Sequence, residues 1–81
     1  MKDIYLLYSC DIWKSKNTMR LEIATTDITK LKNKIIREIE IDNMNVVEKD
    51  YKSFILNNPP HEINIALDNG YIDVVEDGED L

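Results

Sequence analysis

A short polar stretch near the N-terminus carries the side chains best suited to binding another macromolecule. This connector, Cys10 to Thr18, holds the only tryptophan of the chain, Trp13, and lies between two strand-like runs. Aromatic and arginine side chains are enriched where protein interfaces concentrate their binding energy. An alternative is that Trp13 folds back over the sheet edge with Lys14 covering it. The candidate partner-binding residues in and beside the connector are Tyr8, Asp11, Trp13, Lys14, Lys16 and Arg20.

Acidic residues near the C-terminus form a second group of candidates. Asp73, Glu76 and Asp77 belong to it, the last nine residues contain no base, and the net charge of the chain is −6. Nucleic-acid affinity comes largely from lysine and arginine neutralising phosphates, so direct nucleic-acid binding is disfavoured. We expect a protein partner, with these three acids contributing to the contact.

The residues that could do covalent or metal chemistry are too few for a catalytic motif. His61 and Cys10 are each single, and zinc or redox motifs need a second ligand or thiol at short spacing. The two glycines, Gly70 and Gly78, make no phosphate-binding loop. We therefore expect no enzymatic activity, no catalytic residues, no metal and no cofactor. A small-molecule site near Cys10 and His61 remains an alternative, provided that the fold brings the two together.

Length and composition indicate one small globular domain. The chain has 81 residues, 43% of them hydrophobic and 32% charged, and such a length has no material for a second core. We expect a compact domain over residues 1–75 and a mobile acidic tail over residues 76–81. No apolar run reaches the roughly 18 residues that cross a bilayer, and the lone cysteine suits a reducing compartment. The expected location is the cytoplasm of the host cell.

The first half of the chain predicts a hairpin followed by a helix. Residues 4–8 and 19–25 are rich in the β-branched, aromatic and leucine side chains of strands. Apolar residues then recur at spacings of three and four over residues 28–41, which predicts an amphipathic helix capped by Thr26 or Asp27. On the outer face of this helix, Lys34 and Glu38 should attract each other.

The second half predicts two more helices and a last strand. Residues 47–56 have helical spacing, and Pro59 and Pro60 stop that helix. Residues 61–69 fit either a helix capped by Asn58 and ended by Gly70 or a strand, and we favour the helix. With a strand over residues 71–75 beside the first strand, the order is β-β-α-α-α-β. The predicted class is α+β, a three-stranded antiparallel-type sheet with two or three helices on one face.

Three strings of the sequence resemble a family of small phage and prophage proteins from AT-rich bacteria. Members open with LYSCDxWKS, continue through MRL and close near GYIDxVEDGE, and this chain has Leu7 to Ser15, Met19 to Leu21 and Gly70 to Glu79 at those places. The resemblance implies a protein that binds and inhibits a host protein, such as a CRISPR effector or another defence enzyme. The alternative is a self-associating structural or regulatory protein that dimerises through a sheet edge or through the Trp13 region.

Overall fold

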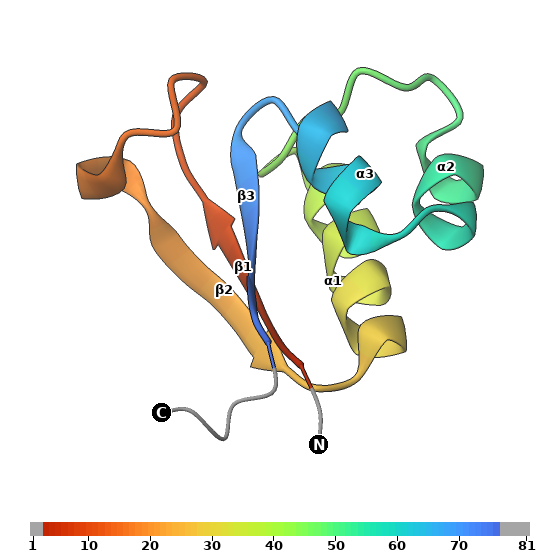
Figure 1. Cartoon of the computed structure of the whole chain (residues 1–81). Coiled ribbons are helices and arrows are strands. Elements are labelled where there is room, and N and C mark those ends of the chain that lie inside the picture. Colours follow the sequence, from red (N-terminus) through yellow and green to blue (C-terminus); the bar gives the residue numbers. More distant parts are fainter. Residues whose placement is uncertain (1–2, 77–81) are drawn as a thin grey trace.

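The computed structural model describes residues 3–76 and confirms the α+β fold with the expected order of elements (Figure 1). The expected tail lies outside the described residues, apart from Glu76. A short 3-10 helix, η1 (Lys16–Thr18), lies within the connector. The strands and α-helices are β1 (Ile4–Ser9), β2 (Arg20–Thr25), α1 (Ile28–Glu40), α2 (Tyr51–Asn57), α3 (Pro60–Ala66) and β3 (Gly70–Val75).

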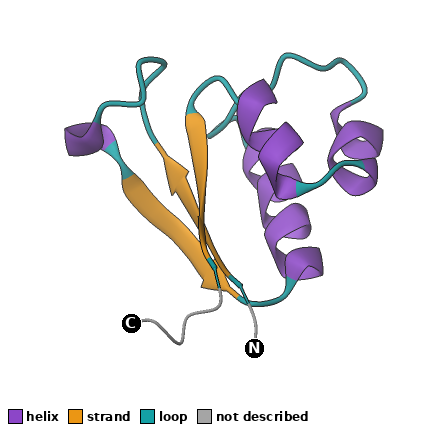
Figure 2. Ribbon diagram, in the orientation of Figure 1, coloured by secondary structure: helices purple, strands orange, loops and turns teal. Residues whose placement is uncertain are grey.

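The sheet is antiparallel and has the strand order β2-β1-β3, so the last strand lies beside the first, as predicted. Leu7, at the centre of β1, is paired with Ile23 of β2 and with Ile72 of β3. A bulge lies in β2 at Glu22, where the register with β1 shifts. In the described part of the chain, α1, α2 and α3 all lie on one side of the sheet, whereas η1 lies at its connector end (Figure 2).

The core fills the space between this side of the sheet and the helices. Because successive side chains of a strand point to opposite faces, Leu7 and Ile72 enter the core while their neighbours point away from the helices. The fully buried large side chains are Leu7, Leu31, Ile35, Met44, Ile55 and Ile63. Among residues 3–76, no helix has the length and apolar character that crossing a membrane would require.

Helix α1 begins as predicted but buries one residue that was expected outside. The Asp27 side chain accepts hydrogen bonds from the N–H groups of Thr29 and Lys30 at 2.8 and 3.4 Å. The ion pair between Lys34 and Glu38 is confirmed at 3.2 Å. The expected outer position of Glu38 is wrong, because this residue is only 3% exposed. Position 38 follows buried position 35 by three residues and so lies at the edge of the apolar stripe.

Helix α2 is shorter than the predicted 47–56. It starts at Tyr51 because Asp50 caps it, accepting from the N–H of Ser53 at 3.4 Å. Val47, expected inside the helix, is 67% exposed and precedes it. The chain between α1 and α2 instead makes an isolated bridge from Val46 to Leu67.

The helical alternative for residues 61–69 is correct, although its ends differ from the prediction. Pro59, not Asn58, stands at the cap position of α3. The Asn58 amide donates instead to the carbonyl of Phe54 at 2.8 Å.

Gly70 does not end α3, and its backbone is not left-handed. It begins β3, where a Cβ would lie 3.1 Å from Sδ of Met44 and 3.2 Å from Cδ1 of Leu67. The glycine therefore permits close packing at the start of β3.

Candidate functional site

The segment Asp11–Ser15, here called the Trp13 turn, is held by hydrogen bonds of its own. The N–H of Lys14 donates to the carbonyl of Asp11 at 3.0 Å, and the N–H of Ser15 donates to the Asp11 carboxylate at 2.9 Å. Lys14 has a φ of 56°, in the left-handed region that few residues other than glycine adopt. The turn is therefore a defined structure, stabilised by Asp11 against an unfavourable backbone angle.

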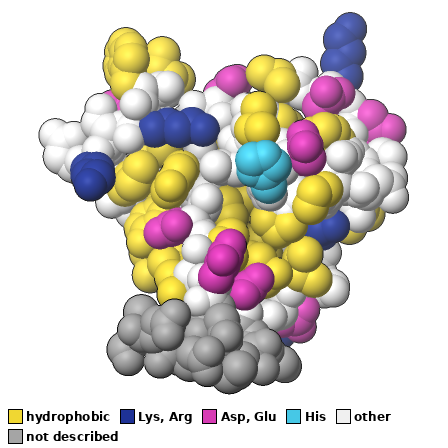
Figure 3. Space-filling view, viewed as in Figure 1, with side chains coloured by type: hydrophobic (Ala, Val, Ile, Leu, Met, Phe, Trp, Pro, Cys, Tyr) yellow, Lys and Arg dark blue, Asp and Glu magenta, His cyan; other side chains and the backbone are white. Residues whose placement is uncertain are grey.

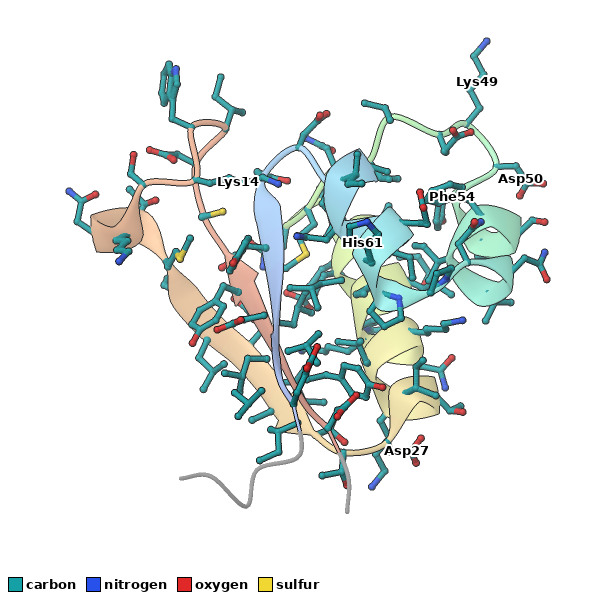
Figure 4. The ribbon with its side chains drawn as sticks, viewed as in Figure 1. Lys14, Asp27, Lys49, Asp50, Phe54 and His61 are labelled. Atoms are coloured by element: carbon teal, nitrogen blue, oxygen red, sulfur yellow. The ribbon has the colours of Figure 1, made fainter. Side chains whose placement is uncertain are left out.

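Neighbouring elements fix the position of the Trp13 turn. The N–H of Asp11 donates to Oγ1 of Thr18 at 3.2 Å, and that hydroxyl donates to the carbonyl of Ser15 at 2.7 Å. The ammonium of Lys14 donates to the carbonyl of Asn64 in α3 at 3.4 Å, a direction visible in Figure 4. The connector is thus attached both to its own 3-10 helix and to the helical layer.

The tip of this turn presents apolar side chains to solvent. Trp13 is 79% exposed and Ile12 is 65% exposed. The alternative in which Trp13 folds back over the sheet is therefore wrong. A large aromatic ring at this exposure gains little from the fold of its own chain, which makes it available for a partner.

Below the connector, side chains from three segments line one hollow of 680 Å³ on the side of the sheet away from the helices. Four of the candidate residues meet here, namely Tyr8, Lys14, Lys16 and Asp73. The other lining residues are Met19 and Tyr71. The rings of Tyr8 and Tyr71 lie with their centroids 6.4 Å apart at 36°, within the range of favourable aromatic pairs.

The remaining candidate residues lie elsewhere. Arg20 is exposed and paired with Ser9. Glu76 follows β3 at the end farthest from the connector, roughly 20 Å along the strand by the usual rise per residue. It borders a second hollow, of 370 Å³, whose lining includes His61 and Tyr5. Asp77 lies outside the described residues, so Asp73 is the acidic candidate that the described structure brings to the connector.

Two titratable groups of the connector differ from their ordinary behaviour. The hydrogen bond from the backbone of Ser15 is the main cause that lowers the pKa of Asp11, which keeps this carboxylate charged. Burial raises the pKa of the Cys10 thiol, with opposite smaller effects from Lys14 and Asp11. A raised pKa leaves a smaller fraction of the thiol as the reactive thiolate at neutral pH. Cys10 borders neither of the two hollows described, so they provide no joint site for this residue and His61.

Tyr71 and Met19 were not among the residues selected from the sequence. Tyr71 joins the hollow because antiparallel pairing places it opposite Tyr8. The strand-like pattern of residues 71–75 could have pointed to Tyr71. That pattern identifies the cross-strand neighbour of Tyr71 only once the register of β3 with β1 is known.

The fold and the site together define a small α+β protein in which a tryptophan-bearing turn, held by hydrogen bonds, lies beside the sheet face that the described helices leave open. In comparisons with known proteins, no family model, curated protein or solved structure matches this chain. In the described part of the chain, no group of three or more histidine, cysteine, aspartate or glutamate side chains is arranged to hold a metal ion.

Proposed function

We propose that this chain is a non-catalytic, phage-type protein that binds and inhibits a host protein through the Trp13 turn. The class of target is a host defence or nucleic-acid enzyme such as a CRISPR effector, a choice that rests on the sequence resemblance. The observation that carries the proposal is the 79% exposure of Trp13 on a turn held by its own hydrogen bonds.

The geometry supports binding in two ways. A turn whose backbone is already held by hydrogen bonds loses little conformational freedom when a partner covers it, so more of the contact energy contributes to affinity. Ile12 next to it enlarges the apolar tip, and Lys16 and Arg20 are exposed nearby along the chain. An apolar centre with charged surroundings is the usual composition of a protein interface.

The proposal is tested by capture from a lysate of the bacterial host. Immobilised wild type is compared with Trp13→Ala and with Trp13→Ala combined with Arg20→Glu, and retained proteins are identified by mass spectrometry. Truncating a central tryptophan typically removes about 2 kcal/mol or more, roughly thirty-fold in Kd. We expect the specific partner to be lost from both variants.

The matched control is Val47→Ala, which truncates an apolar residue of similar exposure, 67%, outside the connector. This variant should retain the partner. Identical sets of retained proteins for wild type and the Trp13 variants would show that the Trp13 turn does not bind the partner. The activity of the captured protein, measured with and without this chain, then shows whether binding inhibits that activity.

A further inference from the structure

The helices leave the opposite side of the sheet, here called the open face, uncovered by helix (Figures 1 and 2). Strand alternation places on it Ile4, Leu6 and Tyr8 of β1, Leu21 and Ala24 of β2, and Tyr71, Asp73 and Val75 of β3. Leu21 is 56% exposed, and the β1 and β3 members are half-buried. A contiguous apolar surface of this kind on a small protein indicates an interaction site.

The charges beside this face distinguish between possible occupants. Lys14 and Lys16 stand at the connector end of the hollow, and Asp73 stands two residues beyond Tyr71 in the other direction along β3. Figure 3 looks at the edge of the sheet formed by β3 and shows basic and acidic side chains close to apolar ones there. An acidic peptide or a nucleic acid would meet Asp73, and a purely basic segment would meet the two lysines.

The partner surface should therefore carry both positive and negative charges beside apolar side chains. The open face of a second copy of this chain has this composition. We infer that the open face binds a second copy of the chain, related by a two-fold axis that passes near the Tyr8 and Tyr71 rings. Such an axis brings Asp73 of each copy toward Lys14 and Lys16 of the other. Two-fold interfaces are self-complementary in this sense, and two-fold dimers are the commonest symmetric homo-oligomers.

The size of the face sets the expected strength. Three six-residue strands cover an area of about 20 Å by 15 Å, roughly 300 Å² per copy, which is smaller than the interfaces of stable complexes and typical of weak, transient ones. The dimer should therefore form reversibly with rising concentration. This inference does not rest on the proposed function, because the dimer contact centres on Tyr8, Tyr71 and Asp73 and not on Trp13, although Lys16 borders both surfaces.

The experiment is sedimentation equilibrium of the full chain over a concentration series, with three charge variants. Asp73→Lys and Lys16→Glu each place like charges against each other in the two-fold arrangement, and each should weaken self-association at least ten-fold. An equal mixture of these two variants restores opposite charges across the interface, and it should associate more tightly than either variant by itself.

Lys49→Glu is the matched control, because it reverses a charge beyond the helical side of the molecule (Figure 4) and should leave the dimer unchanged. Circular dichroism confirms that each variant folds. Wild type that stays monomeric over the whole series would overturn the inference, and so would dimers that persist in Asp73→Lys and Lys16→Glu. A dimer weakened equally by Lys49→Glu would assign the association to net charge and not to this face.

Discussion

At the scale of single residues, Asp11 determines whether the tryptophan is presented at all. Its carboxylate accepts the N–H of Ser15, its carbonyl accepts the N–H of Lys14, and its own N–H donates to Thr18. These contacts close the turn around a lysine whose φ of 56° is unfavourable. The exposed Trp13 therefore depends on a neighbour two residues earlier.

Because the pKa of Asp11 is lowered, the stability of the Trp13 turn should depend on pH. A carboxyl whose pKa falls on folding stabilises the structure above its unfolded pKa of about 3.9, and that contribution is lost as pH falls through the folded value. We expect the Ser15 amide to lose hydrogen-exchange protection in acid before the core amide of Leu7 does. In Asp11→Asn, protection of Ser15 should be weaker at neutral pH and should lack this acid step. Equal pH dependence of Ser15 in wild type and Asp11→Asn would contradict the role of the carboxylate.

At the scale of elements, the join between α1 and the following loop depends on a buried glutamate. Glu38 is 3% exposed and receives the Lys34 ammonium at 3.2 Å and the Asn43 amide at 2.6 Å. Burial would raise the pKa of Glu38, but the hydrogen bonds from Asn43 and Lys34 and the positive charge of Lys34 outweigh this effect and lower the pKa. The carboxylate therefore stabilises the fold in its charged form.

Removing this carboxylate should destabilise the protein measurably. Glu38→Ala leaves two donors without their acceptor, which typically costs about 1 to 3 kcal/mol of unfolding free energy. The control is Glu40→Ala, which breaks the exposed pair with Lys52, worth about 0 to 1 kcal/mol. Urea unfolding at neutral pH measures both.

Urea unfolding of wild type and Glu38→Gln at a series of acid pH values tests whether the negative charge of Glu38 stabilises the fold. Because the folded pKa of Glu38 is lowered, the advantage of wild type over Glu38→Gln should be complete above the unfolded pKa of about 4.3 and shrink as pH falls below it. A difference that stays constant down to acid pH would show that packing, not charge, accounts for the effect.

The elements were the part of the fold that the sequence predicted well. Apolar spacing located α1, and the two prolines located the start of α3, because both signals act within a few neighbouring residues. The start of α2 was missed because Asp50 caps the helix inside a stretch whose apolar spacing already looked helical. The predicted outer position of Glu38 was wrong because its burial depends on Asn43 and on the sheet. The spacing of apolar residues within the helix does not describe these contacts.

The candidate site was predictable only in part, for the same reason. The connector was identified from its composition, whereas its grouping with Asp73 and Tyr71 depends on the pairing of β1 with β3. Glu76 lies near Asp73 in the sequence but ends up beside the other hollow, since alternate residues of a strand point to opposite faces. Register, and not composition, decides which acids meet the connector.

At the scale of the whole molecule, the two surfaces have separate roles in this account. The helices fill one side of the sheet and leave the other uncovered, and the Trp13 turn stands at the connector end of that sheet (Figure 1). A dimer through the open face would carry two such turns and could engage two target sites together, which raises avidity without any new contact. The family resemblance remains a prediction from the sequence and decides only the class of target.

The most direct test of the central claim uses the only tryptophan of the chain as its own probe. Fluorescence emission and acrylamide quenching are measured for the free protein and then during titration with the partner captured from the host lysate. We expect the free protein to show the emission and quenching of a water-exposed indole, followed by a shift to shorter wavelength and protection from acrylamide as the partner covers Trp13. A shielded indole in the free protein, or saturable binding that leaves emission and quenching unchanged, would contradict the account.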